Sequence, residues 1–117
     1  MSLIRFCYDA EGDILDITFG AGKPNQREGF ELNDNIVLFV DRETDRALGI
    51  MFISYSKLVM RKYTVLDLLA RMPLKQQHRL VKIIESELVK PFLTLIVPQK
   101  HEVKIGNPNV NELIAVA

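Results

Sequence analysis

The chain is poor in the residues on which small secreted proteins and zinc-binding domains depend. Cys7 is the only cysteine among 117 residues, and tryptophan is absent. A single thiol excludes an internal disulfide framework and any zinc site built from paired thiolates. Because a chain of this length can bury a core without such crosslinks, we expect one domain in a reducing compartment.

An excess of charge of either sign is also missing. Fifteen Lys and Arg balance fifteen Asp and Glu, so net charge attracts the protein neither to nucleic acid nor to a membrane surface. Charged residues between Asp9 and Asp13 come before any apolar run of signal-peptide length, and no stretch approaches the ~20 apolar residues of a membrane span. We therefore expect a cytoplasmic protein with no membrane association.

Catalytic and cofactor motifs are lacking as well, since there is no Gly-rich phosphate loop, nucleophile elbow or metalloprotease helix motif. Closely spaced carboxylates at Asp9, Glu11, Asp13 and Asp16 invite a metal or acid/base interpretation. The terminal glutamate of a calcium-binding loop is missing, and a turn followed by a solvated strand face explains these residues equally well. The sequence therefore predicts no metal site here.

The remaining reactive side chains are scattered. His78 falls on the polar side of a predicted helix and His101 lies in the tail, each without a nucleophile or carboxylate at a catalytic spacing. Cys7 lies in a predicted strand, and a role as a small apolar filler is the simplest explanation of this residue. We expect no catalytic residue and no cofactor, and hence a protein that is not an enzyme.

Apolar residues alternate with polar ones in the first part of the chain. Ile4, Phe6 and Tyr8 form one such row, and residues 15–19 form the next. The turn residues 9–12 between them predict a β-hairpin. A weaker strand around residues 30–32 follows a Gly- and Pro-containing loop.

Two later runs, residues 36–40 and 47–53, are apolar at nearly every position. Such runs are typical of strands that are buried on both faces. They flank a polar loop at 41–46 and complete the predicted sheet.

The second half of the chain predicts helices. Thr64 with Asp67 resembles a capping box that begins a short helix ending near Met72. Pro73 suits the first turn of a longer amphipathic helix, in which Leu80, Ile84 and Leu88 form the apolar stripe and which Pro91 closes. Residues 92–97 are β-like, and a tail runs from 98 to 117.

These elements define the expected fold. We predict a single α+β domain with an antiparallel β-meander over residues 4–58. A helical layer over 64–90 packs on one face of the sheet, and residues 92–117 supply a β-like segment and tail.

One helical layer cannot cover both faces of strands that are apolar on both sides. Alternation places Val37 and Phe39 on the face opposite to Ile36, Leu38 and Val40. Each large apolar side chain that stays in contact with water loses roughly 1.5–3 kcal/mol of the stabilisation that full burial would give. We therefore predict an oligomer interface, most simply that of a homodimer, or a contact with another protein, at Val37, Phe39, Met51 and Ile53. The alternative is that the tail folds back over this face.

Charge is unevenly distributed along the chain. Acidic residues dominate from Tyr8 to Asp45, and basic residues dominate from Lys57 to Lys82. The basic side chains that could meet phosphates are Arg61, Lys62, Lys75, Arg79 and Lys82. A nucleic-acid-binding or antitoxin-like regulator is therefore the alternative function, and a solvated helix surface is the simpler explanation of the same residues.

Several short patterns in the first half resemble a known bacterial family. A Tyr-Asp turn at Tyr8 and Asp9, Asp13 at the start of the next strand, and Gly49 with Ile50 in the last strand occur in order. Residues 4–58 thereby resemble the family catalogued as domain of unknown function 2283. The resemblance implies a compact antiparallel sheet and no established activity.

The chain departs from this family at Met51, where members often carry glutamate, so a function that requires this carboxylate is not expected here. Some members of such small families resemble partners encoded beside candidate toxins. The resemblance thus implies a protein-binding module, in agreement with the self-associating, non-enzymatic module that the surplus sheet face predicts.

Overall fold

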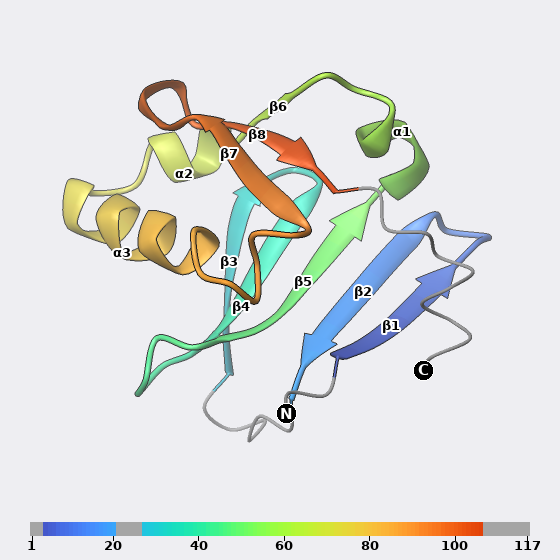
Figure 1. The fold of residues 1–117 in the computed structure, drawn as a ribbon, viewed down its shortest axis with the longest axis horizontal. Helices are drawn as coiled ribbons and strands as arrows, with labels where there is room; N and C mark the ends of the chain where they lie inside the picture. The colour runs from blue at the N-terminus through green and yellow to red at the C-terminus, as the bar shows by residue number, and fades with distance from the viewer. Residues whose placement is uncertain (1–3, 21–26, 107–117) are drawn as a thin grey trace.

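An antiparallel sheet of five strands forms the base of the fold in the computed structural model, which describes residues 4–20 and 27–106. The strands lie in the order β1-β2-β5-β4-β3 (Figure 1). Their bounds are β1 Ile4–Asp9, β2 Ile14–Phe19, β3 Arg27–Asn33, β4 Ile36–Asp41 and β5 Ala47–Ile53. The protein is thus an α+β fold with an antiparallel sheet, as the sequence predicts.

The strand order corrects the predicted meander. β2 pairs with β5, with Ile14 opposite Ile53 and Ile17 opposite Ile50, so that β3 lies at the far edge. The physical reason is burial, because the apolar run of β5 suits the central position with a neighbour on each side. β3, whose residues are alternately exposed, tolerates an edge.

A smaller, three-stranded sheet and three short α-helices follow. The helices are α1 Tyr55–Val59, α2 Asp67–Ala70 and α3 Leu74–Ile84. The small sheet has the order β6-β8-β7 and contains β6 Thr64–Val65, β7 Leu93–Val97 and β8 Glu102–Ile105, with the 3-10 helix η2 Pro98–Lys100 between the last two. Figure 1 shows α2, α3 and this sheet in front of the large sheet.

Two predicted helix boundaries are wrong. Thr64 does not cap a helix, because its backbone pairs with Val103 in the small sheet, and α2 begins at Asp67 without a side-chain cap. α3 ends at Ile84, well before Pro91, and turns occupy most of the segment that follows. The Ser86 hydroxyl donates to the Ile83 carbonyl at 2.6 Å, so it satisfies a carbonyl at the helix end.

The core lies between one face of the large sheet and the layer above it. From the sheet it receives the buried side chains Leu15, Ile17, Phe19, Leu32, Ile36, Leu38, Val40, Ile50 and Phe52. Leu80, Ile83 and Ile84 of α3 pack against them, together with Leu93 of β7 and Val103 of β8. Within the described part of the chain, no helix combines the length and hydropathy needed to cross a membrane.

Candidate functional site

The candidate site is the other face of the large sheet, here called the open face. Cross-strand partners in a sheet point to the same side, so the register identifies the residues of this face. One row runs Cys7, Asp16, Met51, Val37 and Glu31 across the strands. A neighbouring row runs Arg5, Thr18, Gly49, Phe39 and Gly29, and a third joins Asp9, Ile14 and Ile53.

The four residues predicted for an interface lie together on this face. Val37 is directly opposite Met51, and Phe39 and Ile53 are each two positions away along the same strands. All four are partly exposed, whereas Ile36, Leu38 and Val40 on the core face are completely buried. The described helices and the small sheet contribute their buried residues to the opposite side. The sequence therefore identified an apolar surface that these elements do not cover.

Phe39 is shielded on the open face by two residues of β3. Its ring lies over Gly29, where an added Cβ would be 3.0 Å from the Phe39 Cε1 atom. The Arg27 guanidinium stacks on the ring at 3.8 Å from its centroid, a cation–π contact. The sequence alone does not point to Arg27 and Gly29, because only the β3–β4 register brings them to Phe39.

Charged residues surround the apolar centre. Asp16 and Glu31 flank Met51 and Val37 in their row, while Arg27 pairs in register with Asp41. Both acidic and basic side chains therefore border the apolar centre.

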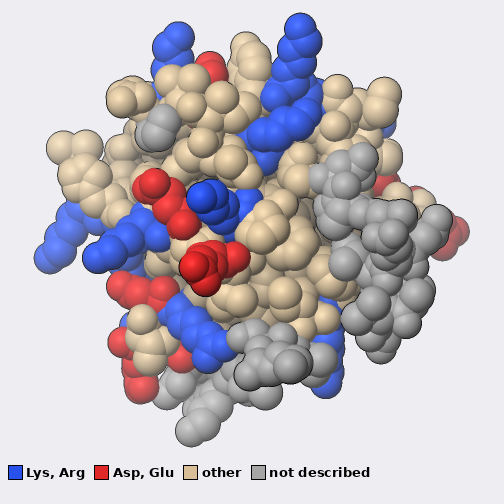
Figure 2. Space-filling model, in the orientation of Figure 1, with Lys and Arg blue, Asp and Glu red and all other residues tan. Residues whose placement is uncertain are grey.

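The predicted basic residues do not form one surface. Arg61 and Lys62 lie between α1 and β6, whereas Lys75 and Lys82 are exposed on α3. Figure 1 shows α1 and α3 on opposite sides of the molecule. Figure 2 shows acidic and basic side chains intermingled over α3 and the turn after it.

Arg79 is occupied by contacts within the chain. Its Nη2 atom lies 2.8 Å from Asp45 Oδ1, and its Nη1 atom lies 4.0 Å from Glu28 Oε1. The guanidinium also lies over the Phe30 ring, 5.5 Å from the centroid. Arg79 therefore ties α3 to the large sheet and is poorly placed to meet phosphates.

The acidic turn has a structural role centred on Asp13. The Tyr8 hydroxyl donates to Asp13 Oδ1 at 2.7 Å, and the Ser56 hydroxyl donates to Oδ2 at 2.6 Å. Hydrogen bonds from Ser56 and then Tyr8 hold the pKa of Asp13 below its usual value, and the bond to Asp13 raises the pKa of Tyr8. Asp9 accepts the Glu11 backbone N–H at 3.1 Å, which is typical of a turn.

The described residues contain no group of three His, Cys, Asp or Glu side chains placed to hold a metal ion. His101 Nε2 lies 3.1 Å from the Gln77 amide oxygen, and the Gln77 amide nitrogen donates to the Ala70 and Met72 carbonyls. This network ties the η2–β8 turn to the start of α3, which is a structural role. Cys7 is exposed on the open face and is not the buried filler that the sequence suggests.

No family model, curated protein or solved structure matches the chain.

Proposed function

We propose that the protein is a non-enzymatic, self-associating module that pairs with a second copy through the open face. The observation that carries this proposal is the cluster of Val37, Phe39, Met51 and Ile53, which is partly exposed on the sheet face away from the helices. Burying these side chains gains roughly 25 cal/mol for each Å² of apolar surface removed from water.

The chemistry of the rim favours a second copy as the occupant. In a twofold interface the same patch of both copies meets. The patch must therefore carry charges of both signs, so that acidic residues of one copy can face basic residues of the other. The open face meets this condition with Arg5 and Arg27 alongside Asp16, Glu31 and Asp41. The mixed rim thus supplies both halves of possible ion pairs around an apolar centre.

The direct experiment is a light-scattering mass measurement on the purified chain. The wild type should elute at micromolar concentration with twice the 13.4 kDa protomer mass. Val37→Asp combined with Met51→Lys should give a folded monomer, because charges then replace both central contacts. Thr44→Lys, in the exposed β4–β5 turn, is the control and should stay dimeric. A wild-type monomer at these concentrations contradicts the proposal and favours coverage by the tail, whose residues 107–117 lie outside the described part.

Nucleic-acid binding through Arg61, Lys62, Lys75, Arg79 and Lys82 is the less supported alternative, since Arg79 is paired and the others lie on separate elements. Retention on a phosphate matrix that falls steeply with salt would favour it. Retention that is indifferent to salt would count against it.

We also propose that residues 4–58 are related to the domain of unknown function 2283 family. The hydrogen bond between Tyr8 and Asp13 supports this kinship, because it gives two residues of the shared pattern a common structural role. Gly49, a third residue of the pattern, is in close contact with the Ile17 carbonyl across the β2–β5 pair.

A further inference from the structure

The small sheet has a free edge at β7. In the order β6-β8-β7, β8 is the only strand within residues 4–20 and 27–106 that pairs with β7. The Gly106 N–H donates to the Phe92 carbonyl at 2.8 Å, which makes this pair a hydrogen-bonded one. Since such pairs alternate in an antiparallel ladder, the backbone of Thr94 points at β8 and that of Leu93 and Leu95 points away.

A second hydrogen bond agrees with this assignment. The Leu93 N–H, on the side away from β8, donates to the Val89 carbonyl at 3.0 Å. The N–H and C=O of Leu95 come next on the same side, along the free edge. They form a donor and acceptor pair of the kind that an additional strand would use.

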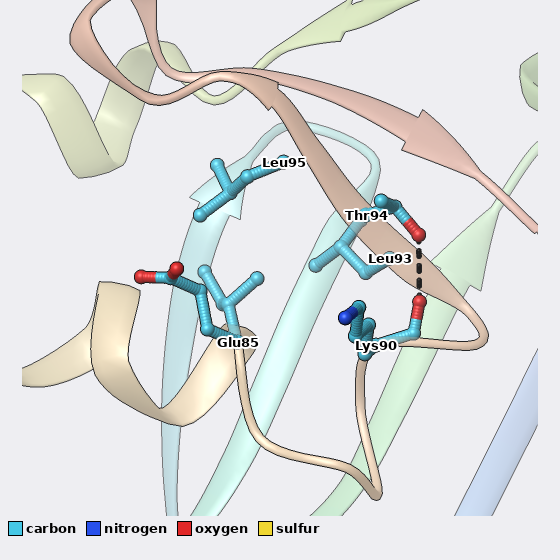
Figure 3. A pocket seen from close by; sticks show the side chains of 6 residues that line it. Glu85, Lys90, Leu93, Thr94 and Leu95 are labelled. Carbon is cyan, nitrogen blue, oxygen red and sulfur yellow. Dashed lines mark hydrogen bonds between the residues drawn. The ribbon is translucent and has the colours of Figure 1, made fainter.

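A pocket of about 220 Å³ opens beside this edge. Its lining residues are Ile84, Glu85, Lys90, Leu93, Thr94 and Leu95. Figure 3 shows Leu93 and Leu95 of β7 on one side and Glu85, at the end of α3, on the other. Ile84 and Leu93 are fully buried beneath the pocket, so its exposed apolar surface comes from the partly exposed Leu95 and has room for a single aliphatic side chain.

Opposite charges flank the pocket. Glu85 lies at the carboxyl end of α3, where the helix dipole adds negative potential, and Lys90 lies on the chain segment that leads into β7. Both side chains are exposed, and neither forms an ion pair within the described ranges. The pocket therefore has an acidic and a basic side available to a ligand.

We propose that the β7 edge binds an extended peptide segment of a partner protein as a fourth strand of the small sheet. The segment pairs with the backbone of Leu95 and inserts an aliphatic side chain into the pocket. A basic residue of the peptide lies toward Glu85 and an acidic one toward Lys90. Strand addition of this kind takes affinity from main-chain hydrogen bonds and specificity from pockets for alternate side chains. The inference is independent of the open face, since Leu93 and Leu95 pack on the core side.

The experiment begins with a phage-displayed library of random octapeptides selected on the full-length chain. The expected consensus is an aliphatic residue with opposite charges two positions to either side. A synthetic consensus peptide, titrated into ¹⁵N-labelled protein, should shift the amides of Leu93 to Val97 and slow hydrogen exchange at Leu95. Methylating the backbone nitrogens of the aliphatic residue and of its two neighbours should abolish these effects, because it removes every N–H that a strand of either direction presents to Leu95.

The specificity test reverses the charges of the pocket. Glu85→Lys with Lys90→Glu should prefer the charge-swapped peptide by about fivefold, the size expected of exposed ion pairs. Glu87→Lys with Lys75→Glu, at exposed positions outside the pocket lining, should keep the original preference. Selected peptides that leave the Leu95 amide unchanged, or that bind equally well when their backbone nitrogens are methylated, would overturn the proposal. So would a chain whose own copies pair through β7, detected as Leu95 protection that disappears on dilution.

Discussion

Asp13 caps a helix that begins far away in the sequence, through its bonds to Ser56. The Asp13 carboxylate accepts the Ser56 N–H at 3.0 Å and the Ser56 hydroxyl at 2.6 Å, across a separation of 43 residues. α1 has no side-chain cap of its own at Ser54. Asp13 therefore satisfies an N–H at the start of α1 and joins the β1–β2 hairpin to the end of β5.

Replacing Asp13 should loosen this junction. Asp13→Ala removes the carboxylate that accepts the Ser56 N–H and hydroxyl, while the Asp13 carbonyl still accepts the Tyr55 N–H. It should lower the melting temperature by roughly several degrees. Ser56→Ala removes only the hydroxyl and should have a smaller effect. Glu11→Ala, in the same turn but without a side-chain hydrogen bond in the described structure, is the control for thermal unfolding. Equal melting temperatures for Asp13→Ala and Glu11→Ala would contradict this role.

The same contact predicts a dependence on pH. The pKa of Asp13 is lower in the folded protein than its usual value of 3.8, so the unfolded chain binds a proton at higher pH than the folded one does. The stability from this carboxylate is therefore present above the usual pKa and is lost as pH falls through the folded pKa. The free energies of unfolding of Asp13→Asn and the wild type, measured with urea from about pH 6 to about pH 2.5, should differ at neutral pH and converge at the acid end. A constant difference over that range would refute the assignment.

Gly49 is predicted to be intolerant of any side chain. An added Cβ would lie 2.6 Å from the Ile17 carbonyl oxygen, a backbone atom of the paired strand β2 that cannot rotate away. Gly49→Ala should therefore cost about 1–3 kcal/mol in the free energy of unfolding. Gly29→Ala meets the Phe39 ring instead, which can move, and should cost less. Denaturant unfolding of the two variants checks the order.

Thr64 carries a polar atom that is unsatisfied. Its hydroxyl oxygen is buried without a hydrogen-bond partner in the described structure. Thr64→Val keeps the shape and removes the hydroxyl, so it should raise the free energy of unfolding by about 1 kcal/mol. Thr94→Val is the matched control. It deletes the 2.6 Å hydrogen bond from the Thr94 hydroxyl to the Lys90 carbonyl and should lower the free energy of unfolding. The opposite order in denaturant unfolding would be inconsistent with this explanation.

Local patterns in the sequence predicted local structure well. Alternation and the turn at Asp9–Gly12 identified the first hairpin, and the runs at 36–40 and 47–53 identified two inner strands, β4 and β5. The partial exposure of Val37 and Phe39 also agrees with the predicted surplus face. These features depend on spacing within a few residues, which a single sequence displays directly.

Long-range pairing could not be predicted in the same way. The position of β2 beside β5 depends on which strand can be central, and the short helix α1 depends on Asp13. Thr64 illustrates the conflict, since its local pattern favours a helix cap while its pairing with Val103 places it in a strand. Arg27 over Phe39 likewise follows from register and not from spacing.

The most direct test of the central proposal measures whether the open face is covered in solution. A soluble paramagnetic agent should leave the methyl signals of Val37, Met51 and Ile53 protected at high protein concentration, while the exposed Ile96 methyls broaden. Dilution should remove this protection, as coverage by a second copy requires. Methyl groups that are accessible at every concentration, or protected equally at every concentration, would contradict it.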